Sequence, residues 1–207
     1  MKKKIFLSAI IILFIFFLTG CGKNNDNNKF VNTKEDVINY LSEKYPDDNF
    51  DSIEYEGETN ALYSGCKKNN SWAVRSTETN VTFKVYGTDY YGAFYCTYDI
   101  DDSYFTSYTS QFLEVNNYTK THNVSYNIIE IYIEDFNNLD EVAKYVLDLS
   151  NSLKNDAKFN SLKEKNTESF NININKDYLY VTSFKIEEIN NITTIKNTIE
   201  NAMNNNS

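Results

Sequence analysis

The stretch Val81-Thr82-Phe83-Lys84-Val85-Tyr86 places an apolar side chain at every second position. Side chains alternate between the two faces of a β-strand, so this period of two predicts a half-buried strand. Gly87-Thr88-Asp89 supplies turn-forming residues directly afterwards, and residues 91–98 are predicted to return as a second strand. The stretch therefore predicts an antiparallel β-hairpin.

A helix and two further strands are expected before this hairpin. Residues 50–56 and 72–76 are predicted strands. Thr33 and Asp36 form a capping box, in which the side chain of each residue bonds the backbone amide of the other, and this marks the start of a helix. The apolar residues that follow repeat at helical spacing, and Pro46 ends the helix.

Strands and helices also alternate after the hairpin. Residues 99–117 are predicted to form a loop with a short helix around 104–113, and residues 128–136 a strand. Asn138 and Glu141 cap a following helix with a clear apolar face.

The last 50 residues predict another hairpin and a closing helix. Residues 158–168 read as a polar connection. Residues 170–174 and 178–186 are the two predicted strands, with a turn at 175–177 between them. Isoleucines at helical spacing from residue 192 onward predict the last helix.

This order of elements predicts an α+β fold, an antiparallel sheet with about three to four helices packed against it. We expect residues 30–207 to form a single domain, because neither half offers a large set of core positions of its own. A subdivision near residues 100–121 is the alternative.

The N-terminus has the arrangement of an export signal. Lys2, Lys3 and Lys4 precede an apolar run from residue 5 to residue 18, which is shorter than the roughly 20 residues that span a bilayer. The run ends Leu18-Thr19-Gly20-Cys21, and this sequence resembles the lipobox of bacterial lipoproteins at all four positions. The resemblance implies attachment of diacylglycerol to Cys21 and cleavage just before it.

Three segments follow from this resemblance: a lipoprotein signal peptide at 1–20, a flexible tether at 21–29 and an extracytoplasmic domain at 30–207. Acyl chains on Cys21 would hold the domain at the cell membrane. The alternative is an ordinary cleavable signal or an uncleaved anchor.

The charge excludes one class of partner. Loss of the three lysines at positions 2–4 takes the formal net charge from −9 to −12, and Arg75 is the only arginine. Nucleic acid binding needs a basic surface, so no nucleic acid partner is expected.

The remaining cysteines are Cys66 and Cys96. In an exported domain two cysteines favour a disulfide, and two separate buried thiols are the alternative. Cys96 with His122, the only histidine, has the composition of a cysteine-nucleophile site, but Cys96 falls in the middle of a predicted strand.

No motif points to a cofactor or a metal. One histidine excludes sites built from two or three histidines. Residues 99–103 resemble the opening of a calcium loop, but Tyr104 stands where a glycine is required and Ser110 where a glutamate is required. We therefore expect no catalytic residue, no cofactor and no metal.

The densest feature is a set of tyrosines between residues 86 and 108. Tyrosine is enriched on surfaces that bind protein or sugar. The candidate binding surface consists of Tyr86, Tyr90, Tyr91, Tyr98, Tyr104, Tyr108 and Arg75. Aromatic pairing that only stabilises the hairpin is the alternative.

The sequence thus favours a lipid-anchored binding module for a protein or cell-envelope ligand. The alternative function is a cell-envelope hydrolase whose site forms only in the folded chain.

Overall fold

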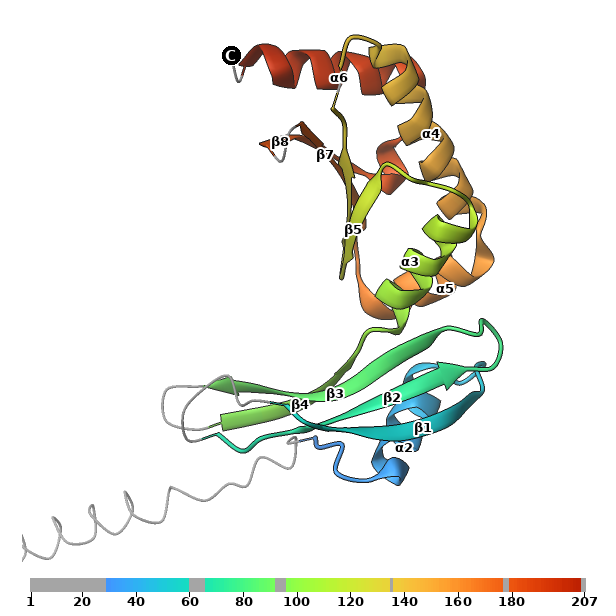
Figure 1. Cartoon of the computed structure of the whole chain (residues 1–207), viewed down its shortest axis with the longest axis vertical. Coiled ribbons are helices and arrows are strands. Elements are labelled where there is room, and N and C mark those ends of the chain that lie inside the picture. The colour runs from blue at the N-terminus through green and yellow to red at the C-terminus, as the bar shows by residue number, and fades with distance from the viewer. Residues whose placement is uncertain (1–28, 60–65, 92–95, 135, 177–178, 206–207) are drawn as a thin grey trace, which may run out of the picture.

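A computed structural model describes residues 29–59, 66–91, 96–134, 136–176 and 179–205. In this part of the chain five α-helices accompany two four-stranded sheets. The two sheets, here named sheet A and sheet B, belong to an N-terminal half and a C-terminal half that meet at helix α3 (Figure 1). The predicted α+β class is confirmed.

Sheet A is an antiparallel meander in the order β1-β2-β3-β4. Its strands are β1 (Phe50–Glu58), β2 (Asn70–Ser76), β3 (Thr82–Tyr91) and β4 (Cys96–Asp102). Helix α2 (Lys34–Lys44) precedes them and buries Val37 and Leu41. The predicted capping box is confirmed, because Thr33 Oγ1 accepts from the Asp36 amide at 3.2 Å and the Thr33 amide donates to Asp36 Oδ2 at 2.8 Å.

Sheet B has the order β5-β6-β7-β8 and is mixed. Its strands are β5 (Thr121–Ser125), β6 (Ile128–Tyr132), β7 (Asn171–Lys176) and β8 (Leu179–Lys185). The middle pair, β6 and β7, runs parallel. Helices α4 (Leu139–Asn155) and α5 (Ala157–Asn166) make the crossover that a parallel pair requires. The short 3₁₀ helix η1 (Ile186–Glu188) and helix α6 (Ile192–Asn205) complete the chain.

Helix α3 (Tyr104–Val115) joins the halves and enters both cores. Tyr104 stacks on Phe83 of sheet A with ring centroids 4.5 Å apart. Phe105 packs on Phe159 of α5 and on Phe170, each at 5.3 Å. The buried apolar side chains of the two halves consequently form one contiguous core.

The structure differs from the predicted fold in the arrangement of its sheets. It has two sheets where one antiparallel sheet was expected, and sheet B contains the parallel pair. Residues 158–168, expected to form a polar connection, lie mostly in α5, and strand β5 was not expected. The predicted helix within residues 99–117 is confirmed as α3, although residues 99–102 belong to β4.

The turn predicted at Gly87-Thr88-Asp89 is wrong, because all three residues lie inside β3. A Cβ atom at position 87 would lie 2.4 Å from Cγ of the Asn69 side chain. Glycine is needed there for close packing against Asn69 and not for chain reversal.

None of the helices in the described residues is long and apolar enough to cross a membrane.

Candidate functional site

Two tyrosines of the predicted surface are buried in the structure. The side chains of Tyr98 and Tyr104 are 7% and 0% exposed, so both belong to the core. Tyr98 packs on Phe30 with ring centroids 4.5 Å apart, and its hydroxyl accepts a hydrogen bond from the Lys67 amide. This burial removes both tyrosines from any binding surface and agrees with the alternative of aromatic packing.

The other members of that predicted surface lie on three elements, namely Arg75 on β2, Tyr86, Tyr90 and Tyr91 on β3, and Tyr108 on α3. Tyr108 is half-buried, and its hydroxyl donates to Asp156 Oδ1 at 2.9 Å. Burial and the neighbouring carboxylate raise the pKa of Tyr108. Tyr86 is half-buried in β3, while the side chains of Tyr90 and Tyr91 lie outside the described residues.

Arg75 is an ion-pair partner on the surface of sheet A. Its guanidinium donates to both carboxylate oxygens of Asp51, at 2.9 and 2.7 Å. These hydrogen bonds hold the pKa of Asp51 below its usual value. Arg75 therefore already has an anionic partner.

The other predicted site residues are the cysteines and the histidine. The structure joins Cys66 and Cys96 in a disulfide, which ties the chain before β2 to the start of β4. A disulfide sulfur cannot act as a thiolate nucleophile. Cys21 and the side chain of His122 lie outside the described residues.

A row of four polar side chains instead crosses sheet B from edge to edge. In the strand register, Asn123 of β5 lies opposite Glu130 of β6, and Glu130 lies opposite Asn173 of β7. Asn173 in turn lies opposite Ser183 of β8. The intervening residues, such as Ile172, are buried, so the row lies on the opposite face. Figure 1 shows α3, α4 and α5 on the other side of the sheet, and we name this uncovered side the open face of sheet B.

Neighbouring rows extend this face along the strands. One row joins Ser125, Ile128, Asn171 and Lys185. The row on the other side joins Tyr132, Asn175 and Tyr180. The open face thus carries amide, hydroxyl and phenol groups, with one carboxylate among its strand residues.

Glu130 stands near the centre of the open face and has a free oxygen. Its Oε2 accepts from Tyr132 OH at 3.1 Å and from Asn123 Nδ2 at 3.4 Å. Its Oε1 accepts from no described residue, and the side chains of Asn173 and Ser183 make no hydrogen bond to the described residues. The central row therefore keeps acceptors and donors available for a ligand.

An exposed tyrosine lies at each end of the open face. Tyr126 follows β5 in the turn to β6 and is 51% exposed, and Tyr180 at the start of β8 is 59% exposed. Beside Tyr180, Asn175 is only 6% exposed, and its Nδ2 has no hydrogen-bond partner among the described residues. A buried amide without a partner is unfavourable unless water or a ligand satisfies it.

A cleft of about 430 Å³ adjoins this face between α3 and β5. Six of its eight lining residues are polar, and Asn123 belongs to both the cleft and the open face. The polar lining residues are Ser110, Glu114, Asn117, Tyr118, Thr119 and Asn123.

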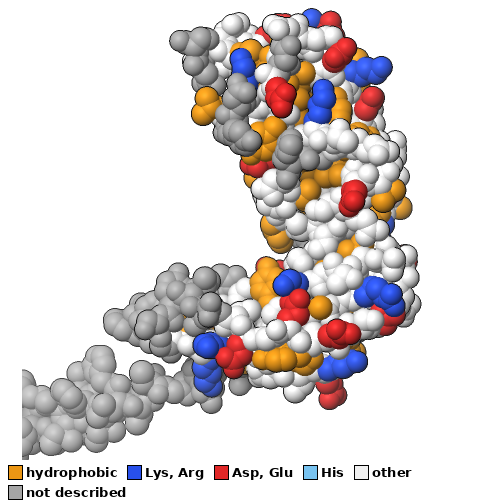
Figure 2. All heavy atoms as spheres, viewed as in Figure 1, with side chains coloured by type: hydrophobic (Ala, Val, Ile, Leu, Met, Phe, Trp, Pro, Cys, Tyr) orange, Lys and Arg blue, Asp and Glu red, His pale blue; other side chains and the backbone are white. Residues whose placement is uncertain are grey.

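Figure 2 shows a broad hollow between the two halves, on the side away from α3 and α5.

Sheet A differs in carrying ion pairs between its strands. Besides the pair between Arg75 and Asp51, Lys84 Nζ lies 2.9 Å from Glu56 Oε2. This hydrogen bond holds the pKa of Glu56 below its usual value. The four side chains of these two pairs already have partners, unlike Asn173 and Ser183 of sheet B, which make no hydrogen bond to the described residues.

Two polar clusters between the halves are structural. The buried Asp102 carboxylate accepts from Tyr40 OH at 2.6 Å, Lys44 Nζ at 2.8 Å and Tyr45 OH at 3.0 Å. Tyr45 OH in turn accepts from Asn166 of α5 at 3.1 Å. Burial, and then the nearby Asp102 charge, raise the pKa of Tyr40 and of Tyr45. A carboxylate held by so many donors positions the halves and is a poor general base.

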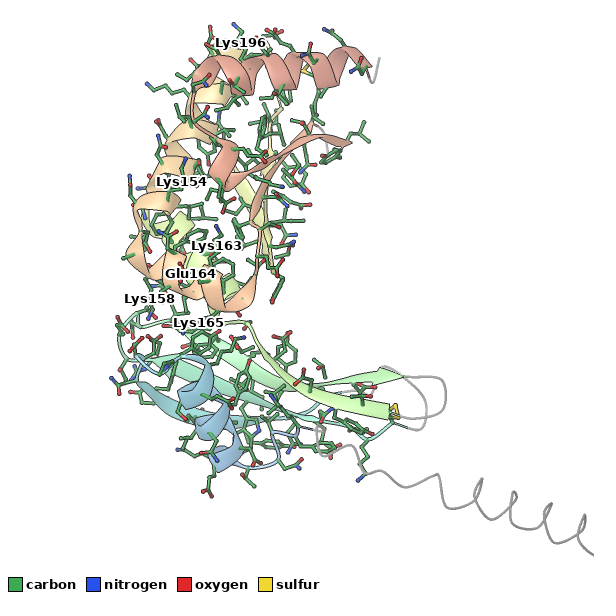
Figure 3. All side chains as sticks on the ribbon, turned by 180° about the vertical axis from the view of Figure 1, so that it is seen from behind. Lys154, Lys158, Lys163, Glu164, Lys165 and Lys196 are labelled. Carbon is green, nitrogen blue, oxygen red and sulfur yellow. A yellow bond between two sulfur atoms is a disulfide. The ribbon has the colours of Figure 1, made fainter. Side chains whose placement is uncertain are left out.

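The second cluster centres on Lys158 of α5, at the junction of the halves (Figure 3). Its ammonium pairs with Asp48 and, at 3.1 Å, with Glu78. Asp48 is 6% exposed at its side chain, and its Oδ2 has no hydrogen-bond partner in the part of the chain that the structure describes. Lys158 thus compensates a buried charge that belongs to the other half.

The described residues contain no group of three or more histidine, cysteine, aspartate or glutamate side chains arranged to hold a metal ion. Comparison with family models, curated proteins and solved structures found no match to this chain.

The sequence carried a signal for the open face of sheet B. Asparagines at 171, 173 and 175 alternate with the buried Phe170, Ile172 and Ile174. Asparagine is abundant throughout the chain, so asparagines at alternate positions could reflect the overall composition as well as a polar face of a strand.

Proposed function

We propose that this protein is a lipid-anchored extracytoplasmic binding module and that the open face of sheet B is its binding surface. The observation that carries the proposal is the central row of Asn123, Glu130, Asn173 and Ser183, which spans four strands and retains hydrogen-bonding groups that no described residue satisfies. Polar groups that fix the orientation of a ligand are what a recognition surface requires.

The position of this face supports a role away from the membrane. Residues 22–28 separate the lipobox cysteine from the first described residue, and Lys29 hydrogen-bonds Tyr98 of sheet A. Sheet B lies in the other half of the molecule (Figure 1). An acyl group on Cys21 would therefore place sheet A nearest the bilayer and leave sheet B directed toward the cell envelope.

The test is cosedimentation of the full-length protein, solubilised in detergent, with insoluble cell-envelope fragments. The double variant Asn123→Ala/Asn173→Ala removes two amides from the open face of sheet B. Loss of two hydrogen bonds corresponds to roughly tenfold weaker binding. The matched control, Ser71→Ala/Thr82→Ala, removes two hydroxyls from strands of sheet A. The proposal fails if the first variant binds as well as the unaltered protein, or if the unaltered protein does not bind.

A cell-envelope hydrolase has less support. Cys96 is held in the disulfide. Glycoside hydrolysis uses a pair of carboxyl groups, whereas Glu130 is the single carboxylate among the strand residues on the open face of sheet B.

A further inference from the structure

We infer that the ligand of the open face of sheet B is an uncharged, hydroxyl-rich glycan chain. This inference rests on the proposed function and specifies the class of ligand.

The first argument is the hydrogen-bonding inventory. An asparagine side chain offers two donors and an acceptor with two lone pairs, and a serine hydroxyl is both donor and acceptor. Asn171, Asn173 and Ser183 place such groups side by side on two neighbouring strands. A sugar hydroxyl is likewise donor and acceptor, so a chain of sugars can satisfy this mixture in either direction. A peptide backbone in an extended conformation would instead pair with a strand edge.

The second argument is charge. The row of unpaired groups contains Glu130, with one carboxylate oxygen free, and the only cation among the strand residues on this face is Lys185, at the end of an outer row. The formal net charge of the whole chain is −9. An anionic polymer would meet a carboxylate and no cluster of lysines or arginines, which recognition of phosphate or carboxylate requires. A free carboxylate oxygen, in contrast, is a strong acceptor for ligand hydroxyls.

The third argument is shape. The rows that contain Ser125 and Tyr180 cross β7 four residues apart, which corresponds to about 13 Å along the strand. Tyr126 and Tyr180 stand exposed at the two ends of this floor. A tyrosine ring offers an apolar face with a polar tip, on which the apolar face of a sugar ring can pack. A floor of this length is longer than one sugar ring and accommodates a chain of sugars.

A protein partner fits less well. Protein interfaces are built around a desolvated centre of large apolar or aromatic anchors. The centre of this face is Glu130 and Asn173, and its tyrosines stand toward the ends. Ile128 is the one aliphatic side chain that the rows present. The arrangement is thus the reverse of a typical protein-binding centre.

The test is isothermal titration calorimetry of the full-length protein in a polyoxyethylene detergent, since maltoside detergents carry a sugar of their own. The probes are three neutral tetrasaccharides, namely chitotetraose, cellotetraose and maltotetraose, and the anionic polymer polygalacturonate. We expect at least one neutral probe to bind and polygalacturonate not to bind. Asn173→Ala and Tyr180→Ala are each expected to weaken that binding about tenfold.

The matched control is Tyr55→Ala, because Tyr55 is 54% exposed, close to the exposure of Tyr126 and Tyr180, but lies in the N-terminal half. The inference is overturned if no neutral probe binds, if polygalacturonate binds as tightly, or if Tyr55→Ala weakens binding as much as Tyr180→Ala. If no probe binds while Asn123→Ala/Asn173→Ala still weakens cosedimentation, the glycan assignment is wrong and the binding face stands. If that variant has no effect on cosedimentation either, the proposed function is wrong as well.

Discussion

Tyr104 and Phe105 are adjacent in sequence, yet their rings lie in the cores of different halves. Tyr104 is 0% exposed and stacks on Phe83, whereas Phe105 is 2% exposed and contacts Phe159 and Phe170. Successive side chains of a helix point about 100° apart, so the first turn of α3 can serve two cores at once. The halves are therefore expected to unfold together.

Replacement of either ring by alanine should cost about 3–5 kcal/mol of unfolding free energy, as other buried aromatic residues do. We expect Phe105→Ala, although it lies in the core of the C-terminal half, to shift the unfolding of the N-terminal half equally. Trp72, the only tryptophan, reports on sheet A by fluorescence, and circular dichroism reports on the helices of the C-terminal half. The two transitions in urea should coincide. If Phe105→Ala leaves the urea midpoint of the tryptophan fluorescence transition unchanged, the halves fold independently.

Lys158 should contribute far more to stability than Lys163, although both lie on α5 and both side chains are 17% exposed. The partner of Lys158 is Asp48, 6% exposed, whereas the partner of Lys163 is Glu187, 50% exposed. Removing one member of a buried pair leaves an uncompensated charge, so Lys158→Ala should cost about 3–5 kcal/mol.

Lys163→Ala, the control on the same helix, should cost less than about 1 kcal/mol, because its partner remains solvated. Urea denaturation of both variants makes the comparison. Equal losses would mean that the junction of the halves does not depend on the pair between Lys158 and Asp48.

The cluster around Asp102 predicts how the protein unfolds in alkali. Burial and the Asp102 carboxylate raise the pKa of Tyr40 and Tyr45 above the ordinary value of 10.0, so the folded state disfavours their ionised forms. The unfolded chain loses these protons first. The stability they contribute is therefore complete below pH about 10 and declines above it, by at most about 1.4 kcal/mol per pH unit for each group.

Absorbance at an ultraviolet wavelength specific for tyrosinate checks this prediction. Tyr40 and Tyr45 should be among the tyrosines that ionise only together with the loss of circular dichroism, and Tyr40→Phe should reduce the number of such tyrosines by one. Ionisation of every tyrosine before any unfolding would contradict the assigned cluster.

The sequence predicted most elements of the fold, because their signals are local. The capping box of Thr33 and Asp36 and the cap of α4 by Asn138 form as expected, since each needs only residues three apart. Helix α5 was missed because only Phe159 and Leu162 mark its apolar face and because Asp156 ends α4 and begins α5 at once.

The candidate site was harder to predict because it depends on strand pairing. Nothing in the sequence places Asn123 beside Glu130 and Asn173, because that row depends on the register of β5, β6 and β7 and on a parallel crossover. The tyrosines between residues 86 and 108 were conspicuous by number, but Tyr98 and Tyr104 are buried in the core. The number of tyrosines in a segment does not show which of their side chains face the core and which face solvent.

The lipobox resemblance predicts that Cys21→Ser abolishes acylation. Cells fed an alkyne-bearing fatty acid should label the unaltered protein and not the variant, because the thiol that receives diacylglycerol is gone. The variant should also lose its resistance to extraction from the membrane by salt. Equal labelling of both proteins would rule out Cys21 as the site of lipid attachment.

The most direct test of the binding face is side-chain footprinting of the full-length protein with and without cell-envelope fragments. Tyr126, Tyr180 and Tyr55 are 51%, 59% and 54% exposed. We therefore expect the three side chains to react at similar rates with a tyrosine-specific reagent when no ligand is bound. We predict that bound envelope material protects Tyr126 and Tyr180 and leaves Tyr55 as reactive as before. Protection of Tyr55 alone, or of none of the three, would contradict the assignment of the open face of sheet B as the binding surface.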